Sequence, residues 1–204
     1  MKGGAPRGAT AQGLPREVRL IGGQWKRSRL PVLDRPGLRP TPDRVRETLF
    51  NWLGQGLTGW RVLDAYAGTG ALGFEAASRG AAEVLMIETD AQALANLREV
   101  KQRLQATQVQ LLPADALAWL ERAGTGRWDL VFLDPPFDKN VVEAALAAAA
   151  PTLAEGGRVY VEAPRELQAA PAGLLRHRHL RAGAVHAHLF VRAPGPAAEP
   201  ISPD

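Results

Sequence analysis

The segment Asp134-Pro135-Pro136-Phe137 brings a carboxylate, two prolines and an aromatic ring together directly after the apolar run 130–133. Proline fixes φ and has no N–H, so the backbone here is stiff and its carbonyls are free to accept hydrogen bonds. A carboxylate, a free carbonyl and a ring side by side suit a planar group that carries an NH2. Taken alone, the segment is equally compatible with a strand that ends at prolines and tucks Phe137 into the core.

A second candidate site is the glycine-rich loop 64–73, where Gly68-Thr69-Gly70-Ala71-Leu72-Gly73 matches the pattern G-x-G-x-x-G. The loop lies between an expected strand and an expected helix, as nucleotide cofactors require, but the pattern fits nicotinamide and S-adenosylmethionine enzymes alike. Asp64 separates the two, because its carboxylate suits a cationic amino group and would repel a pyrophosphate. The loop therefore favours S-adenosylmethionine, although Asp64 is also compatible with a strand-end cap. The expected cofactor contacts are Asp64, Ala67, Gly68, Thr69 and Gly70.

Further acids follow the next two expected strands. Glu88 ends the second strand, where an acid can bind a ribose diol, and Asp90 is expected to cap the following helix. Asp115 and Ala116 end the third strand, where they could bind the edge of an adenine. For Asp115 a helix N-cap is an equally good interpretation.

The elements that must position these residues alternate along the chain. Strands are expected at 61–66, 83–88, 109–114, 128–133, 157–162, 174–181 and 185–192, with helices near 70–79, 90–105, 115–122 and 139–153. This alternation predicts an α/β fold with a doubly wound, mostly parallel sheet. Because no helix fits between the last two strands, they should form an antiparallel hairpin. Five βα units closed by a hairpin are typical of the Rossmann-like class I methyltransferases, with a seven-stranded sheet.

In this topology the strand before Asp134 lies beside the first strand, so Asp134 would be within reach of a transferred methyl group. If the Asp134 carboxylate and the Pro135 carbonyl accept the two N–H bonds of an aromatic amine, its nitrogen is held toward the sulfonium methyl. Phe137 would stack on the base and contribute about 1–3 kcal/mol. Much of the acceleration in such an in-line displacement comes from positioning.

The charge is concentrated near the N-terminus. Residues 1–40 carry nine Lys or Arg against two acids, whereas the whole chain has a net charge of only +4. An uneven basic segment indicates a polyanionic partner, usually nucleic acid. Alternating apolar and polar residues at 18–21 and 24–27, around Gly22-Gly23, predict a small hairpin, with a basic linker as the alternative. The expected RNA-binding residues are Arg19, Trp25, Lys26, Arg27, Arg29, Arg39 and Arg44.

A helix is expected to begin after Thr41, with Thr41 as N-cap, Pro42 as first residue and Asp43 favourable to the helix dipole. Val45, Leu49, Trp52 and Leu53 would share its apolar face. Arg44, Arg46 and Glu47 would then lie away from that face.

Composition narrows the class of protein. The chain has no cysteine, which excludes disulfides and Cys-ligated zinc. It shows no signal peptide and no membrane-spanning run, so we expect a cytoplasmic protein without membrane association. His177 and His179, like His186 and His188, share a strand face; without a nearby carboxylate set we expect no metal there.

The chain also resembles the bacterial small-subunit (16S) ribosomal RNA guanine-N2 methyltransferase family. The resemblance rests on the segments 19–25, 37–41, 43–53, 64–73 and 134–137, and extends across most of residues 18–192. It implies S-adenosylmethionine as the methyl donor and the exocyclic N2 of one guanine in 16S ribosomal RNA as the acceptor. Members of the family act on the assembled or partly assembled small subunit.

The expected organisation is a flexible tail at 1–14, a basic RNA-binding hairpin or arm at 15–40, a class I methyltransferase domain at 41–192 and a second tail at 193–204. We expect a monomer whose catalytic residues are Asp134, Pro135 and Phe137. The remaining alternatives are methylation of adenine N6 or of a glutamine side chain, a non-catalytic ribosome-binding module, and a nicotinamide dehydrogenase.

Overall fold

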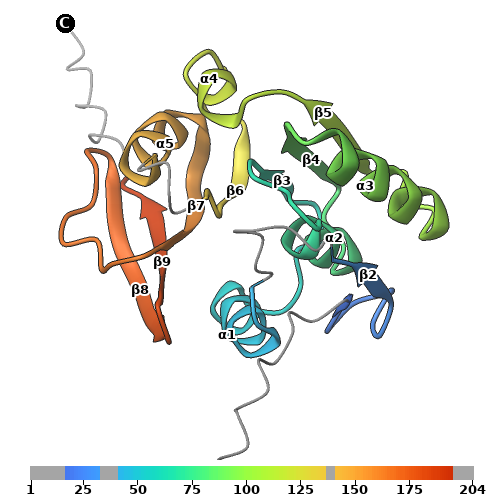
Figure 1. The fold of residues 1–204 in the computed structure, drawn as a ribbon. Coiled ribbons are helices and arrows are strands. Elements are labelled where there is room, and N and C mark those ends of the chain that lie inside the picture. The colour runs from blue at the N-terminus through green and yellow to red at the C-terminus, as the bar shows by residue number, and fades with distance from the viewer. Residues whose placement is uncertain (1–16, 33–40, 137–140, 195–204) are drawn as a thin grey trace, which may run out of the picture.

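The computed structural model describes residues 17–32, 41–136 and 141–194, and Figure 1 shows their arrangement. A seven-stranded sheet has the strand order β5-β4-β3-β6-β7-β9-β8. Its strands are β3 Arg61–Asp64, β4 Glu83–Glu88, β5 Val109–Pro113, β6 Trp128–Leu133, β7 Leu153–Ala163, β8 Leu174–Ala182 and β9 Val185–Arg192.

The strand pairing confirms the predicted fold class. All pairs from β5 through β7 are parallel, whereas β9 pairs antiparallel with both β7 and β8. From β3 the chain adds β4 and β5 on one side and then β6 and β7 on the other, so the strand order reverses between β3 and β6. Open α/β sheets bind ligands at the carboxyl ends of the strands beside such a point.

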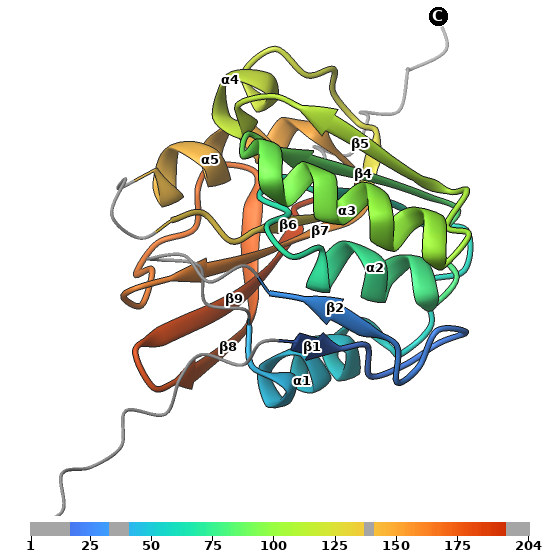
Figure 2. The same cartoon turned by 45° about the vertical axis from the view of Figure 1, so that its right-hand side comes forward.

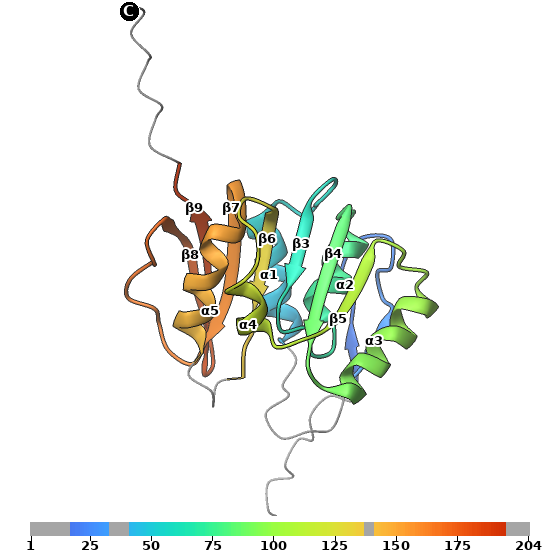
Figure 3. The same cartoon turned by 90° about the horizontal axis from the view of Figure 1, so that it is seen from above.

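Helices cover both faces of the sheet (Figures 2 and 3). One core contains side chains of α1 Asp43–Leu53, α2 Ala71–Ser78 and α3 Ala91–Arg103, and the other contains side chains of α4 Ala116–Leu120 and α5 Val142–Ala149. The alternation of strand side chains divides the two cores, because Phe132 and Tyr160 face the first and Val131 and Val161 face the second. This parity also fixes the face on which the acids at the strand ends lie.

The element bounds differ from expectation mainly around β7. This strand begins at Leu153, earlier than the expected residue 157, and a 3-10 turn, η2 Ala150–Thr152, connects it to α5. Pro151 lies in that turn, where its missing N–H and fixed φ favour an end to the α-helix. The expected start of the preceding helix at 139 lies outside the described residues.

The basic N-terminal segment forms a two-stranded hairpin, β1 Glu17–Arg19 with β2 Arg29–Pro31. The two strands are farther apart in the sequence than the predicted strands 18–21 and 24–27. The N–H groups of Gln24 and Trp25 bond to the Ser78 carbonyl and hydroxyl of α2, at 2.8 and 2.9 Å, instead of to a partner strand. Figure 2 shows the hairpin between α1 and α2.

Packing makes this hairpin part of the folded body. Val18, Leu20 and Leu30 are buried in the same core as α1 and α2. Ile21 donates its N–H to the Glu75 carboxylate at 2.8 Å. The described part of the segment is therefore a docked hairpin, and residues 1–16 and 33–40 lie outside the described residues.

The start of α1 corrects two predictions. The N-cap position is Pro42, and Thr41 does not cap the helix because its hydroxyl donates to Glu162 instead, at 2.8 Å. Arg46 does not lie away from the core but is fully buried. Its guanidinium binds the carbonyls of Thr41 and Arg19 at 3.2 and 2.9 Å and the Asp43 carboxylate at 2.5 Å. A cation is tolerated there because these acceptors surround it.

Among the described residues, none of the helices has the length and apolar character needed to cross a bilayer.

Candidate active site

Acidic residues gather at the carboxyl edge of the sheet, on both sides of the point where the strand order reverses. Asp64 and Glu88 end β3 and β4, Asp134 follows β6, and Glu162 lies near the end of β7. Asp64, Asp134 and Glu162 have the same parity as Val62, Phe132 and Tyr160, so they project from the α1 and α2 face. The structure thus brings together residues that are far apart in the sequence.

The glycine loop links β3 to α2 in the geometry that the pattern predicts. Gly70 is the N-cap of α2 and has a left-handed φ of 77°. A Cβ at Gly73 would lie 2.5 Å from Met86 Cε and 2.9 Å from Asp64 Oδ2. The absent side chain therefore lets the first turn of α2 approach β4 and the Asp64 carboxylate closely.

Asp64 is buried beneath this loop. Its Oδ2 accepts the Gly73 N–H at 2.9 Å, which satisfies a backbone donor in the first turn of α2. Burial raises the pKa of Asp64 to about 7, an effect that the Gly73 hydrogen bond opposes and the charge of Glu88 reinforces. Asp64 thus makes the contact expected of a cap. Its carboxyl is also poorly solvated, so a nearby cation would stabilise the ionised form.

Glu88 connects the glycine loop to the turn after β4. One carboxylate oxygen accepts the Gly68 N–H at 2.9 Å, and the other accepts the N–H groups of Thr89 and Asp90 at 2.8 Å each. Asp90 caps α3 by accepting the Ala93 N–H at 2.8 Å, as predicted. Glu88 is thus oriented at the loop on which a cofactor would lie.

Asp115 is the N-cap of α4, the second of its two predicted roles. Its side chain accepts the Ala118 N–H at 2.8 Å. Ala116 is the first residue of that helix and is buried.

Tyr66, in the glycine loop, has a buried hydroxyl without a hydrogen-bond partner among the described residues. Burial, reinforced by the charge of Asp115, raises the pKa of Tyr66 to about 12. This donor is a further polar group at the loop, and it was not among the predicted site residues.

Asp134 lies where the prediction placed it, one residue beyond β6 and beside β3. The residue as a whole is partly exposed, and Pro135 is buried. Burial of the carboxyl raises the pKa of Asp134 well above its ordinary value, and Glu162 and Asp64 raise it further. Phe137 falls outside the described residues, so its expected stacking role stays a prediction.

Glu162, Tyr160 and Thr41 form a buried hydrogen-bonded group beside Asp134 that the sequence analysis missed. The hydroxyls of Thr41 and Tyr160 both donate to Glu162 Oε1, each at 2.8 Å. A glutamate inside the otherwise apolar segment 159–163 was the available signal, because an acid is rarely buried without a partner. Thr41 also lines a cleft of about 390 Å³ between α1 and the hairpin, with Arg19 and Arg29 on its other side.

The predicted RNA-binding residues divide into exposed and partly buried ones. Arg19, Lys26, Arg27, Arg29 and Arg44 are exposed, Trp25 is partly buried against the core, and Arg39 lies outside the described residues. Arg19 pairs with Asp43 at 3.5 Å and Arg29 pairs with Glu17 at 2.9 Å. Arg19, Lys26, Arg27 and Arg29 lie on the docked hairpin rather than on a free arm, and Arg44 lies on α1.

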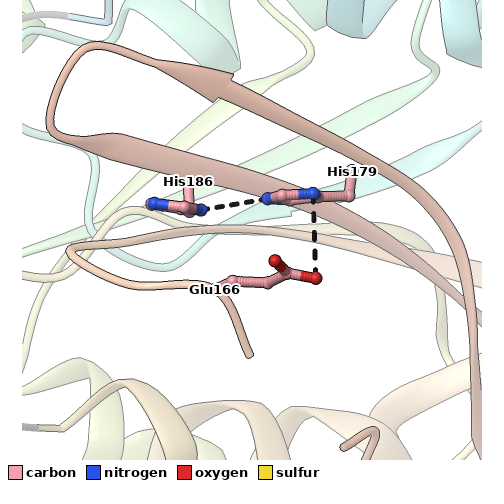
Figure 4. A group of neighbouring side chains, drawn as sticks. All are labelled: Glu166, His179 and His186. Atoms are coloured by element: carbon pink, nitrogen blue, oxygen red, sulfur yellow. Dashed lines mark hydrogen bonds and ion pairs between the residues drawn. The ribbon is translucent and has the colours of Figure 1, made fainter. Parts of the chain in front are cut away.

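The histidines of β8 and β9 form a separate cluster (Figure 4). His179 Nε2 and His186 Nδ1 are 3.0 Å apart, and Glu166 Oε1 lies 4.0 Å from His179 Nδ1, so a carboxylate is nearby after all. Arg176 already binds that Glu166 oxygen at 2.9 Å. Burial lowers the pKa of His188 to about 4, and the neighbouring His179, His186 and Arg176 lower it further. The positive surroundings disfavour a cation, so we propose no metal here.

The parallel sheet with its terminal antiparallel hairpin, the glycine loop and the acids at the strand ends define a class I methyltransferase fold. The chain belongs to the family described as Conserved hypothetical protein 95, which matches residues 18–191. It is 41% identical over 180 residues to the ribosomal RNA small subunit methyltransferase D of Escherichia coli K12, covering 86% of this chain and 90% of that protein.

Two further relatives agree with this assignment. The ribosomal RNA small subunit methyltransferase D of Haemophilus influenzae is 40% identical over 155 residues, which cover 74% of this chain and 80% of that protein. The solved structure of the Escherichia coli protein yhhF is similar with a TM-score of 0.78 and 40% identity, covering 88% of this chain and 99% of that one.

Proposed function

We propose that this protein transfers a methyl group from S-adenosylmethionine to the exocyclic N2 of one guanine in 16S ribosomal RNA, in the assembled or partly assembled small subunit. The observation that carries the proposal is the position of Asp134 and Pro135 beside the loop 64–73, in a chain 41% identical to a ribosomal RNA small subunit methyltransferase. A cytoplasmic location and a monomeric state accompany this proposal.

The glycine loop fits the proposed cofactor. Gly73 leaves a close approach that a Cβ would fill, and Asp64 is a buried acid whose pKa of about 7 makes it responsive to a nearby positive charge. We assign Asp64 to the cationic methionine part of the cofactor, Ala67 to Gly70 to its backbone contacts, Glu88 to the ribose diol, and Asp115 with Ala116 to the adenine. When bound, the cofactor supplies an electrophilic methyl group on sulfonium.

The chain's own residues hold the acceptor. An aromatic exocyclic amine is a weak nucleophile, because its lone pair delocalises into the ring. The Asp134 carboxyl and the Pro135 carbonyl would accept its two N–H bonds and keep the nitrogen oriented, while Phe137 stacks on the base. Positioning of this kind can supply a large part of the rate enhancement.

A basic surface formed by the hairpin and α1 favours an RNA acceptor. Exposed Arg19, Lys26, Arg27 and Arg29 lie on the hairpin, which borders the cleft that Thr41 lines, and Arg44 extends them along α1. Cations that neutralise phosphates position a nucleic acid without reading its sequence. The choice of guanine over adenine therefore rests on the family resemblance.

Mapping of the product tests the proposal directly. The full-length protein is incubated with labelled S-adenosylmethionine and either naked 16S RNA or unmethylated small subunits, and the RNA is then digested to nucleosides. We expect N2-methylguanosine at one position, with more label on subunits than on naked RNA. Label in N6-methyladenosine or in protein would overturn the assigned acceptor, and absence of label would overturn the methyltransferase assignment.

A further inference from the structure

Basic charge gathers a second time near the C-terminal end of the chain. Residues 164–194 contain five arginines and all four histidines against one acid, Glu166, whereas the segment 41–163 carries 16 acids against 11 Lys or Arg. All but one of these basic residues lie on β8 and β9, the antiparallel β8–β9 hairpin that closes the sheet. The cations that the proposed function uses lie on the N-terminal hairpin and α1, so this second concentration has no role in it.

The hairpin lies at the edge of the molecule. Within the described sheet β8 is an edge strand, because it pairs with β9 alone. Residues 175–179 of β8 are all exposed, and Leu175 is 58% exposed. Figures 1 and 2 show the β8–β9 hairpin on one side of α1 and the N-terminal hairpin on the other.

Three of the five arginines are already engaged. Arg165 and Arg176 pair with glutamate side chains, and Arg192 donates to a backbone carbonyl of β7. Arg178 and Arg181 are exposed and donate to backbone carbonyls of their own hairpin, at 3.0 and 3.3 Å. Neither has a carboxylate partner within the described part of the chain. Their remaining N–H donors suit a ligand that is rich in acceptors.

The two free guanidiniums flank the same open edge. Arg178 pairs with Leu189 and Arg181 pairs with His186, so their side chains leave opposite faces of β8. At an edge strand both faces meet the solvent along the free edge. An extended ligand that runs along this edge therefore reaches both arginines.

The strand register leads this edge to the acids of the site. β9 is antiparallel to both β7 and β8, so β8 runs in the direction of β7 and ends at the same edge of the sheet. Glu162 pairs with Ala187, and Ala187 pairs with Leu180, the residue before Arg181. β8 is three strands from β6, so Arg181 lies roughly 15 Å from Asp134 along the carboxyl edge.

The chemistry of the two arginines fits phosphate. A guanidinium is always charged and offers a planar fork of N–H donors that matches a phosphate group. Charged side chains on an edge strand also keep other strands from pairing with it, which is the alternative explanation. That protection needs neither one sign of charge nor a position near the site, whereas the unpaired charges here are both positive and lead to the carboxyl edge.

We propose that the β8–β9 hairpin is a second RNA-binding surface, on which Arg178 and Arg181 bind phosphates of nucleotides that flank the methylated base. The inference rests on the proposed function and extends it from the base to the neighbouring backbone. Phosphate contacts fix the register of a nucleic acid and carry no sequence information. The surface thus contributes affinity and orientation, and the chemistry stays with the acids.

The test is the salt dependence of RNA binding by the double variant Arg178→Gln with Arg181→Gln. Filter binding with labelled 16S RNA measures the dissociation constant over a range of salt concentrations. The loss of two phosphate contacts should reduce the slope of log K against log salt by roughly 1.4–1.8. If the two lines meet at about 1 M salt, binding at about 0.1 M salt weakens roughly 25–60-fold.

Two matched variants control for charge and position. Arg178→Lys with Arg181→Lys keeps both charges and should keep the wild-type slope. Arg98→Gln with Arg122→Gln removes two exposed arginines on α3 and after α4, and should also leave the slope unchanged. In methylation assays the Gln variant at 178 and 181 should show a higher KM for RNA, with kcat and the affinity for S-adenosylmethionine unchanged within about twofold.

The outcomes separate this surface from the proposed function. A wild-type slope in the Gln variant at 178 and 181 would overturn the surface, and self-association of that variant in size-exclusion chromatography would then assign the arginines to protection of the edge strand. An equal loss of slope in the Lys variant would overturn a phosphate contact through charge. A wild type that binds RNA without forming N2-methylguanosine would overturn the proposed function, while the slopes still decide whether the β8–β9 hairpin binds RNA.

Discussion

At the scale of single residues, the site is a set of poorly solvated acids, of which Asp64 and Glu162 are buried and Asp134 is partly exposed. Asp64, Asp134 and Glu162 project from one face of the sheet at its carboxyl edge, where burial raises the pKa of each. Uncompensated burial of a carboxylate disfavours folding, because the folded state prefers the neutral acid. Such groups are typical of functional sites, where a ligand supplies the missing charge or donors.

Replacement of Asp134 separates chemistry from binding. Asp134→Ala removes the group that we propose as the acceptor for the amine, so we expect turnover to fall by about 100-fold or more while S-adenosylmethionine binds nearly as tightly as to the wild type. Calorimetry and a single-turnover assay measure the two quantities. Because the lost carboxyl is destabilised by burial, the variant should unfold at a denaturant concentration no lower than the wild type at pH 8. Retained turnover would contradict the role of Asp134.

Asp64 predicts a pH dependence of cofactor binding. Its pKa is about 7 in the folded protein against an ordinary value of 3.8, so below pH 7 a cationic ligand must displace a proton to meet a carboxylate. The affinity for S-adenosylmethionine should therefore rise by up to about tenfold per pH unit below pH 7 and level off above it. Titration calorimetry at pH 6 and pH 8 in two buffers of different ionisation enthalpy measures both the affinity and the released proton.

The control for this dependence is Asp64→Asn, which cannot titrate. It should bind weakly with an affinity that is flat between pH 6 and pH 8, whereas the exposed Glu121→Gln should behave as the wild type. A wild-type affinity that does not change across this range would show that the Asp64 carboxyl is not the partner of the cofactor's positive charge.

At the scale of elements, the central point is how the basic hairpin is attached. The backbone N–H of Trp25 and the carbonyl of Gly22 both bond to the Ser78 hydroxyl of α2, and Arg46 of α1 donates to the Arg19 carbonyl. The exposed cations of the hairpin are thereby held in fixed positions relative to the cleft beside Thr41. A rigid surface of this kind would orient an RNA bound to it, which a free arm would not.

This attachment predicts that the hairpin contributes to global stability. Leu30 of β2 is fully buried in the core shared with α1 and α2, so Leu30→Ala should lower the free energy of unfolding by about 2–5 kcal/mol. Leu175→Ala, at an exposed leucine of β8, is the control and should change it by less than about 0.5 kcal/mol. Urea unfolding followed by circular dichroism measures both, and a hairpin variant as stable as the wild type would show that the hairpin unfolds independently of the body.

The elements also show what the sequence could and could not predict. Apolar runs and the glycine pattern were enough to place the strands, the loop 64–73 and Asp134 beside β3, because these depend on local periodicity and on the topology of the fold. Thr41 and Arg46 were assigned wrongly because their partners are remote: Glu162 lies 121 residues from Thr41, and Arg46 meets the Glu75 carboxylate at 3.7 Å. A local cap and an amphipathic face were the best local interpretations, and tertiary contacts overrode both.

At the scale of the whole molecule, charge is distributed unevenly relative to the acid site. The exposed cations Lys26 and Arg27 lie in the connection of the hairpin, which bonds to Ser78 at the end of α2, whereas the acids lie at the carboxyl edge of the sheet, where α2 begins. A polyanion bound to these two cations would thus meet positive charge away from the carboxyls. This separation lets affinity and chemistry depend on different residues.

The salt dependence of RNA binding tests that separation. The double variant Lys26→Gln with Arg27→Gln should weaken binding to the small-subunit RNA and reduce the slope of log K against log salt by roughly 1.4–1.8, the effect of two lost phosphate contacts. The control, Arg122→Gln with Arg127→Gln, removes the same charge from two exposed arginines near the end of α4 and the start of β6, and should leave the slope unchanged. Binding is measured by fluorescence anisotropy across a range of salt concentrations.

Equal slopes for the hairpin variant and the wild type would place the electrostatic contact with RNA elsewhere on the molecule. A change in kcat without a change in slope would mean that the hairpin acts on the chemistry rather than on RNA capture.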